Sequence, residues 1–242
     1  MAEHESLTAL YSLTGEMPHR IHVEIFTFLG LLGDLRGKRV LDAACGHGLY
    51  SRILKQRGAA RVVGVDLSEP LLQIARDIEA KSPLGIEYVH ADITSAPDLG
   101  ELDLVTAVWL FPFAETPEHL EAIARGLHRR LVPGGVLAGI TASTDLAPDR
   151  AVYERYGLAV HTPAAPGDGD LYTVDIHSDP PFSFSARFWT VPAVERALSA
   201  AGFRDVAWSP PRCSPEGMAQ LGADHWATML DHPLMRFFTC RR

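Results

Sequence analysis

The sequence predicts an α/β fold with a doubly wound, mostly parallel seven-stranded sheet, an antiparallel last strand and an inserted lid. Two observations predict it. Between residues 39 and 142, five short apolar segments alternate with segments of helical periodicity, an order typical of βαβ units. The apolar segments are continuous, which is typical of parallel strands covered on both faces. Right-handed crossovers then place helices on both sides of the sheet.

Local signals define each element in order. Residues 17–33 carry apolar side chains at helical spacing, and Gly33 is suited to end that helix. Ser68 and Thr190 are expected to cap the helices that follow them, and Thr116-Pro117 is expected to start another helix. The expected parallel strands are residues 39–44, 62–66, 86–90, 102–109 and 136–141.

After Thr141 this rhythm stops. Residues 143–182 are rich in Pro, Gly, Asp and His, and a segment of that length inside a compact domain is usually a lid or a binding insertion. Residues 182–189 alternate as a strand, a helix follows from Thr190 to Gly202, and residues 203–208 and 234–240 are expected to form an antiparallel pair.

Composition limits the possible functions. The 242 residues carry 22 Lys+Arg and 30 Asp+Glu, a net charge of −8, which disfavours a nucleic-acid partner. No apolar run approaches the ~20 residues that span a bilayer, so we expect no membrane partner. The start has no signal-peptide pattern, and three separated cysteines fit a reducing compartment, so we expect a cytoplasmic protein with no metal site.

The segment Val40–Gly48 is the most informative motif, because it runs from a buried strand into a glycine turn. Gly46 and Gly48 allow the backbone to approach a ligand closely. Asp66 ends the next strand, 20 residues beyond Gly46, where a carboxylate can accept hydrogen bonds from both ribose hydroxyls. Ser51 stands where a dinucleotide fingerprint needs a third glycine. A ligand with a ribose and no phosphate therefore fits better.

Five segments together resemble the motifs of class I S-adenosylmethionine-dependent methyltransferases, in the same order and spacing over residues 35–142. They are Asp42-x-x-Cys45-Gly46-x-Gly48, Val62–Asp66, Ala91-Asp92-Ile93, Asp103–Trp109 and Leu131–Gly135. Four further segments resemble bacterial toxoflavin-type small-molecule methyltransferases. They are Ala107–Phe111, Arg155–Leu158, Asp179–Phe182 and Ala200–Phe203.

The resemblance implies a methyltransferase that uses S-adenosylmethionine, leaves S-adenosylhomocysteine and needs no metal. The implied acceptor is a small nitrogen heteroaromatic, azapteridine-like or indole-like, methylated on a ring nitrogen or carbon. We expect one domain over residues 1–242, as monomer or homodimer. Its parts are an N-terminal helical cap (1–35), a cofactor-binding half (36–142), a substrate lid (143–182) and a C-terminal completion of the sheet (183–242).

The resemblance also assigns roles at the cofactor. Asp92 would accept from the adenine amine, Ile93 would donate its backbone N–H to the ring, and Arg20 would pair with the methionyl carboxylate. His22 lies about 200° around a helix from Arg20, so the two cannot share a face. The full expected cofactor set is Tyr11, Arg20, Asp42, Ala44, Gly46, Gly48, Asp66, Leu67, Ala91, Asp92, Ile93 and Val108.

Aromatic residues after the fourth strand and in the lid are candidates for the acceptor site. Trp109, Phe111 and Phe113 border the crevice of an open sheet, and ordinary core packing is the competing interpretation. The lid adds Tyr153 and Tyr172 as substrate contacts. A third group, suited to take a proton, consists of Tyr156, His161 and His177.

Three alternatives remain open at this stage. A methyltransferase that acts on RNA or protein would need a basic face or an added recognition domain. A nicotinamide dehydrogenase would need the missing glycine. A cofactor-binding module without catalysis is compatible with the same fold, since a fold does not prove a reaction.

Overall fold

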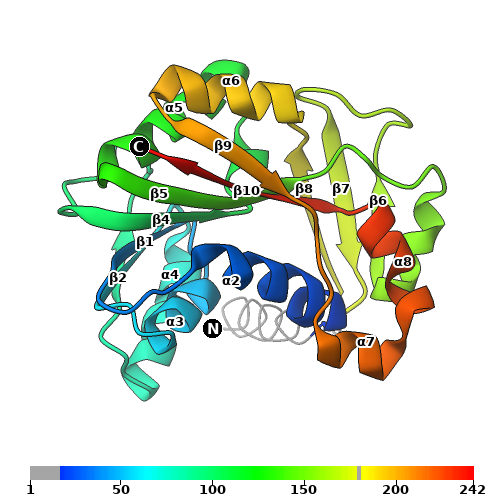
Figure 1. The fold of residues 1–242 in the computed structure, drawn as a ribbon, viewed down its shortest axis with the longest axis horizontal. Coiled ribbons are helices and arrows are strands. Elements are labelled where there is room, and N and C mark those ends of the chain that lie inside the picture. The colour runs from blue at the N-terminus through cyan, green and yellow to red at the C-terminus, as the bar shows by residue number, and fades with distance from the viewer. Residues whose placement is uncertain (1–16, 179–180) are drawn as a thin grey trace.

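The main sheet positions everything else in the protein. The computed structural model describes residues 17–178 and 181–242. The strands of the sheet are β1 (Arg39–Ala43), β2 (Arg61–Asp66), β3 (Glu87–His90), β4 (Leu102–Val108), β5 (Leu131–Ala142), β9 (Arg204–Ser209) and β10 (Met235–Arg241). Their order is β3-β2-β1-β4-β5-β10-β9 (Figure 1). The first five pair in parallel, and β10 is antiparallel to both β5 and β9, which confirms the predicted fold class.

Helices cover both faces of this sheet. They are α2 (Phe26–Leu32), α3 (Leu49–Gln56), α4 (Glu69–Lys81), α5 (Pro117–Arg130) and α6 (Val191–Ala201). Neighbouring strand residues point to opposite sides, so Val40 packs in the core under α2 and α3, while Leu41 packs in the core under α5 and α6. These two layers explain why the strands read as continuous apolar runs. Ser68 and Thr190 accept the capping bonds that the sequence predicts, and Thr116 caps α5, which begins where the sequence predicts a helix.

The N-terminal helix has an unusual first part. The predicted helix over residues 17–33 is present, but Arg20–Ile25 forms a π-helix, η1, before α2 begins. Gly33, with φ 64°, follows the last turn as expected. Short π-helical segments are rare and occur frequently at functional sites.

The lid contains a second sheet. It follows the short helix η3 (Arg150–Tyr156) and has the order β6-β7-β8, with β6 (Leu158–His161), β7 (Leu171–Ile176) and β8 (Phe182–Arg187) all antiparallel. The division at residue 182 is therefore wrong in one respect, because β8 completes the lid sheet and not the main sheet. The reason is the register, in which Phe182 and Phe184 pair with Ile176 and Val174.

Two helices between β9 and β10 were not predicted from the sequence. They are α7 (Pro215–Leu221) and α8 (Ala223–Asp231). The signal for α7 was present, since Ser214 caps it by accepting from the Gly217 backbone and Pro215 occupies its first turn.

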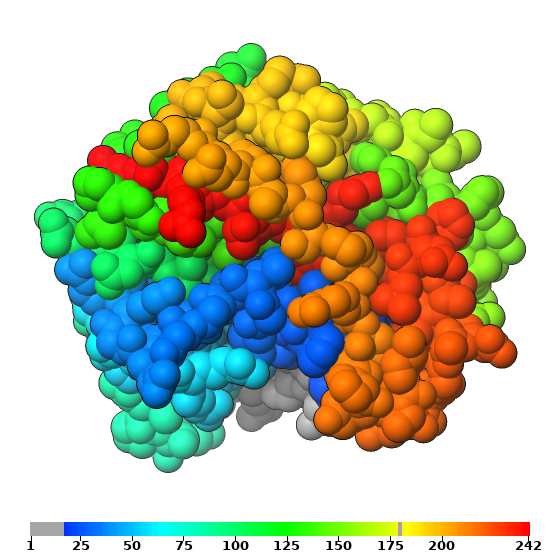
Figure 2. Space-filling view, in the orientation of Figure 1, coloured from blue at the N-terminus to red at the C-terminus, as the bar shows by residue number. Residues whose placement is uncertain are grey.

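Segments from the two ends of the described chain lie against each other. Figure 2 shows the blue surface of η1 and α2 beside the orange surface that leads from β9 into α7. The Thr27 hydroxyl donates to the Arg212 carbonyl at 2.9 Å, and the His22 ring bonds the Ser214 hydroxyl at 2.8 Å. This contact fixes the N-terminal helical segment over the sheet.

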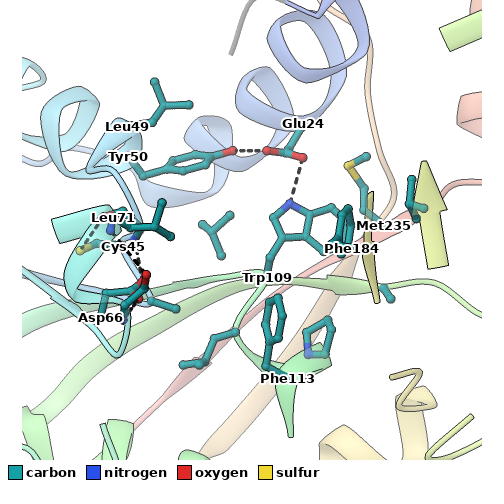
Figure 3. A pocket seen from close by; sticks show the side chains of 18 of the residues that line it. Glu24, Cys45, Leu49, Tyr50, Asp66, Leu71, Trp109, Phe113, Phe184 and Met235 are labelled. Carbon is teal, nitrogen blue, oxygen red and sulfur yellow. Dashed lines mark hydrogen bonds between the residues drawn. The ribbon is translucent and has the colours of Figure 1, made fainter. Parts of the chain in front are cut away.

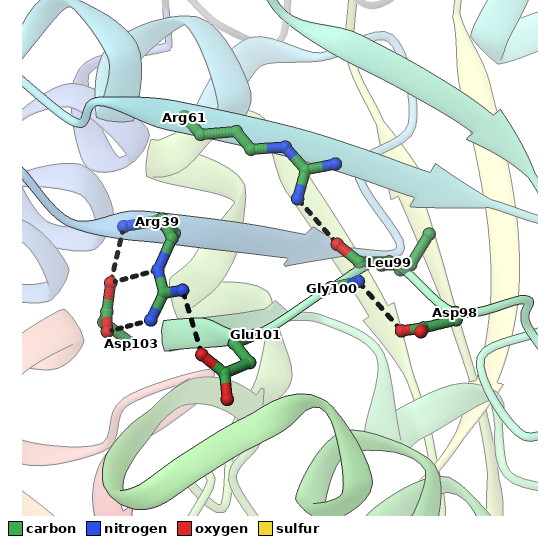
Figure 4. A network of polar contacts seen from close by, with 7 residues as sticks. All are labelled: Arg39, Arg61, Asp98, Leu99, Gly100, Glu101 and Asp103. Carbon is green, nitrogen blue, oxygen red and sulfur yellow. Dashed lines mark hydrogen bonds and ion pairs between the residues drawn. The ribbon is translucent and has the colours of Figure 1, made fainter.

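A polar network closes the amino ends of the strands, which is the end away from the motifs (Figure 4). The Arg39 guanidinium donates to Asp103 through Nε at 3.0 Å and Nη2 at 2.8 Å, and it pairs with Glu101 at 3.3 Å. The Arg61 Nη1 donates to the Leu99 carbonyl at 2.6 Å. These contacts tie the starts of β1, β2 and β4 together.

None of the helices in the described part of the chain is long and apolar enough to cross a membrane.

Candidate functional site

A cavity of about 640 Å³ lies at the carboxyl ends of the parallel strands, within the ~300–1,000 Å³ typical of small-molecule sites. Its walls are the strand ends, the N-terminal helical segment and the inner face of the lid sheet. This is the place where open α/β sheets bind ligands. Thirteen predicted site residues line it: Arg20, Asp42, Ala44, Gly46, Asp66, Leu67, Ala91, Asp92, Ile93, Val108, Trp109, Phe113 and Tyr172.

The turn after β1 has a left-handed backbone at three positions. Ala44, Gly46 and Gly48 have φ values of 60°, 54° and 80°. A Cβ on Gly48 would overlap the Tyr88 hydroxyl, so both conformation and space require glycine there. Gly48 does not line the cavity but starts α3, so it shapes the turn.

Asp66 holds its carboxylate at the end of β2 with backbone hydrogen bonds. Gly46 N–H donates to Oδ2 at 2.7 Å and Ser68 N–H donates to Oδ1 at 2.8 Å. Burial raises the pKa of this carboxyl, and backbone N–H donors from Ser68, Gly46 and Leu67 partly oppose that rise. A carboxylate has about four acceptor positions, so Asp66 can also accept from a ribose hydroxyl.

Asp42 is the buried acid of the first motif. It is 1% exposed, and it accepts from the Ser51 hydroxyl at 2.6 Å and the Thr106 hydroxyl at 3.0 Å. Burial raises its pKa to about 6, while the two hydroxyl donors act in the opposite direction. Its side chain joins β1 to α3 and β4 beneath the cavity.

The residues after β3 form the side of the cavity predicted to hold adenine. Asp92 Oδ1 accepts from the Thr94 backbone at 2.8 Å, which is a local turn bond. Ile93 is 6% exposed and lines the cavity. This turn bond uses only one lone pair of the carboxylate, so Asp92 can still accept from an adenine amine. The roles of Asp92 and Ile93 toward adenine stay predictions.

A polar group that the sequence did not predict lies between the two ends of the cavity (Figure 3). The Glu24 carboxylate accepts from the Tyr50 hydroxyl at 2.8 Å and from the Trp109 indole at 3.0 Å. Arg20 Nε lies 3.3 Å from the same carboxylate. His22 points away to Ser214, as expected from the helical geometry.

The lid sheet turns an apolar face to the cavity. Alternate residues of its three strands form this face: Leu158, Val160, Tyr172, Val174, Ile176, Phe182 and Phe184. Tyr172 is 5% exposed, and its ring packs 4.4 Å from that of Phe188. Together with Trp109 and Phe113, this face gives the lid end an aromatic and aliphatic lining.

The structure places the three predicted proton acceptors away from the cavity. His161 lies on the outer face of β6, where its Nε2 pairs with Asp175 at 2.7 Å. Strand alternation explains this, because its neighbour Val160 faces inward. His177 is exposed beyond β7. The Tyr156 hydroxyl donates to the His225 carbonyl at 2.5 Å and accepts from the Met229 backbone, so it is a structural group.

Two predicted substrate contacts are also core residues. Phe111 is fully buried, 5.6 Å from the ring of Phe238. Tyr153 is fully buried, and its hydroxyl donates to the His232 carbonyl and accepts from the Ala147 backbone. For Phe111 the competing interpretation of core packing was therefore correct. Tyr11 lies outside the described residues.

Other residues of the lining were missed by sequence reasoning. His19 and His47 are both nearly buried; burial, with nearby Arg20, lowers their pKa values to about 4 and about 3. His119, at the start of α5, also lines the cavity. In residues 17–178 and 181–242, no three His, Cys, Asp or Glu side chains are grouped to hold a metal ion.

Comparisons with known proteins agree with this geometry. Residues 40–135 match the family model described as a methyltransferase domain. A ubiquinone biosynthesis O-methyltransferase from Pseudomonas aeruginosa is 34% identical over 103 residues, which are 42% of this chain and 43% of that protein. The chain thus matches less than half the length of this relative.

Solved structures share the whole fold. A crystal structure of a S-adenosylmethionine dependent methyltransferase from Mesorhizobium loti is 24% identical, with a TM-score of 0.65 over 90% of this chain and 97% of that one. The magnesium protoporphyrin IX methyltransferase from Synechocystis, solved with bound SAM, is 18% identical, with a TM-score of 0.53 over 90% and 76%. Residues 40–135 thus match a methyltransferase domain, and the fold as a whole is shared with solved S-adenosylmethionine-dependent methyltransferases.

Proposed function

We propose that the protein transfers a methyl group from S-adenosylmethionine to a ring nitrogen or carbon of a small, uncharged nitrogen heteroaromatic. The observation that carries this proposal is the division of one cavity into two chemically different ends. One end has the left-handed turn and the carboxylate of Asp66, and the other has the apolar lid face.

The cofactor end fits the nucleoside part of S-adenosylmethionine. Asp66 offers two oxygens on a fixed carboxylate for a ribose diol, and no cationic side chain lies in the described turn after β1 to favour a phosphate. Arg20 lines the same cavity, so it remains the candidate partner of the methionyl carboxylate.

The acceptor end supports a neutral, flat molecule. Aliphatic and aromatic side chains from the lid face Trp109 and Phe113 across the cavity. His19 and His47 are poor proton acceptors near neutral pH, because burial lowers their pKa values to about 4 and about 3. This environment suits an acceptor that attacks without first losing a proton, such as a ring nitrogen or an electron-rich ring carbon.

Catalysis by these residues is mainly positioning. When bound at this end of the cavity, S-adenosylmethionine would supply a methyl group activated by its sulfonium, with the bonding electron pair left on sulfur as the acceptor forms its new bond. The lid and Trp109 orient the acceptor and exclude water, which can contribute several kcal/mol. The positive charge moves from sulfur to the methylated ring, and aromatic faces favour such a dispersed cation.

Calorimetry with S-adenosylmethionine and S-adenosylhomocysteine tests the cofactor end. Asp66→Asn should weaken both by about 10- to 100-fold, since hydrogen bonds to charged groups contribute about 1.5–3 kcal/mol. Asp98→Asn is the matched control, because Asp98 also accepts from a backbone N–H, that of Gly100, but lies away from the cavity. Wild-type protein that binds neither ligand would refute the proposal.

A panel of azapteridines, indoles and phenols, followed by mass spectrometry, tests the acceptor. Gain of one methyl group by a heterocycle supports the proposal. The name of the Pseudomonas relative favours a second candidate, O-methyl transfer to a phenol or quinol ring. That reaction needs a proton acceptor, and His119 is the lining imidazole to test, by His119→Gln. Methylation of phenols alone, lost in that variant, would favour the second candidate.

A further inference from the structure

The buried carboxylate of Glu24 is the least expected group in the cavity wall. It is 4% exposed, and buried carboxylates are rare unless they are paired. Its three partners come from three different places in the chain: Arg20 from η1, Tyr50 from α3 and Trp109 from the end of β4. One carboxylate thus connects the N-terminal helical segment to both halves of the cavity.

Trp109 needs such a contact, because its backbone is strained. Its φ is 59°, a left-handed conformation that is unfavourable for a bulky side chain. Residues held in this way persist only where their surroundings fix them, and they gather at functional sites. The Trp109 backbone N–H donates to the Ile140 carbonyl at 3.0 Å, and its indole N–H donates to Glu24 at 3.0 Å.

The indole stands between two groups of lining residues. Figure 3 shows Asp66 and Leu71 on one side of Trp109, and Phe184 and Met235 on the other. We infer that Glu24 is a positioning residue that fixes the Trp109 indole as the partition between the cofactor end and the acceptor end. The names of these two ends rest on the proposed function.

The chemistry requires a carboxylate and not an amide at this position. Two donors, the Tyr50 hydroxyl and the Trp109 indole N–H, reach different oxygens of Glu24. Glutamine keeps the size of the side chain but offers one acceptor oxygen and an NH₂ group. The Tyr50 hydroxyl can also accept, but the Trp109 indole N–H and the Arg20 guanidinium, which face different oxygens of Glu24, can only donate. Glu24→Gln therefore turns its NH₂ group toward one of these two donors, while the size of the side chain is preserved.

The chain contains a matched control. Trp208 Nε1 donates to Glu195 at 2.9 Å, which is the same type of bond outside the cavity. In a ¹⁵N-resolved NMR spectrum, Glu24→Gln should move the indole signal of Trp109 and speed its hydrogen exchange. Glu195→Gln keeps an acceptor oxygen for the Trp208 indole and should leave the Trp109 signal unchanged. An unchanged Trp109 signal in Glu24→Gln would overturn the inference.

Ligand binding separates positioning from general structural support. S-adenosylhomocysteine probes the cofactor end, and Nile red, a neutral flat fluorophore, probes the acceptor end. We expect Glu24→Gln to weaken Nile red about tenfold and S-adenosylhomocysteine less than threefold. Glu195→Gln should change neither affinity. Equal weakening of both ligands, or of neither, would contradict the inference.

A double variant tests whether Glu24 acts through Trp109. If it does, Glu24→Gln should add nothing to the loss of Nile red affinity in Trp109→Phe. Additive losses would show that the carboxylate acts by another route and would overturn the inference. If the proposed function is wrong, the wild-type protein will not bind S-adenosylhomocysteine. The NMR measurements on the Trp109 indole can still be interpreted in that case.

Discussion

The hydroxyl of Tyr172 differs from the hydroxyls of three other buried tyrosines in the described part of the chain. Those of Tyr50, Tyr153 and Tyr156 all have protein partners. The Tyr172 hydroxyl is buried in the lining and has no hydrogen-bond partner in the described part of the chain. Burial raises its pKa, so it is a neutral donor. An unsatisfied buried hydroxyl costs about 1–3 kcal/mol, which a ligand with an acceptor atom would recover.

Tyr172→Phe should therefore separate stability from binding. The free energy of unfolding should stay the same or rise by about 1 kcal/mol, because a buried unsatisfied group is removed. The KM of an acceptor that the protein methylates should rise several-fold, while the affinity for S-adenosylhomocysteine is retained. Thermal unfolding and steady-state kinetics measure the two effects.

Tyr153→Phe is the comparison that should behave oppositely. Its hydroxyl donates to the His232 carbonyl and accepts from the Ala147 backbone, so its loss should lower the free energy of unfolding by about 1–3 kcal/mol. The KM of the acceptor and the affinity for S-adenosylhomocysteine should be unchanged. A destabilised Tyr172→Phe with normal KM would show that this hydroxyl has only a structural role.

At the scale of elements, the sequence predicted the parallel strands and the first residues of the helices well, because these depend on local apolar runs and on single capping residues. It did not predict the lid sheet, whose strands pair across irregular loops. His161 was predicted to lie at the site because the lid strands were not known. Once β6 is known, alternation with Val160 excludes it from the cavity. The contact between Thr27 and Arg212 spans most of the chain, and no local pattern indicates it.

The glycine turn between β1 and α3 provides a test at this scale. Gly48→Ala and Gly134→Ala both place alanine at a left-handed position, with φ values of 80° and 78°, which costs about 1–2 kcal/mol. Only Gly48 has a close neighbour, the Tyr88 ring, whereas a Cβ on Gly134 meets nothing within 4 Å. Urea unfolding should therefore show a clearly larger loss for Gly48→Ala.

Adding Tyr88→Phe refines this comparison. It removes the hydroxyl nearest the added methyl, so it should recover part of the loss in Gly48→Ala, while ring atoms at 2.9 and 3.0 Å remain close. S-adenosylhomocysteine affinity should fall with Gly48→Ala and not with Gly134→Ala. Equal destabilisation by the two alanines would mean that the turn adapts without strain.

At the scale of the whole molecule, ionisable groups buried around one cavity couple its chemistry to folding. Burial lowers the pKa of His19 to about 4 and that of His47 to about 3, whereas burial raises the pKa of Asp42 to about 6. Between pH 6.5 and 4, an unfolded histidine binds a proton that the folded one does not, so stability is lost as the pH falls. Asp42 has the opposite effect between about pH 6 and 4, because its folded form binds the extra proton.

Variants at these positions should therefore change the pH dependence of unfolding in opposite directions. From pH 7 to pH 4, His19 alone should remove about 3 kcal/mol of stability. In His19→Phe this loss should be absent, so the curve of unfolding free energy against pH becomes flatter than that of the wild type. Asp42→Asn should make the curve steeper, since the opposing contribution is removed. Denaturant titrations at half-unit pH steps measure both slopes, and parallel curves for wild type and His19→Phe would show that His19 does not stay neutral on folding.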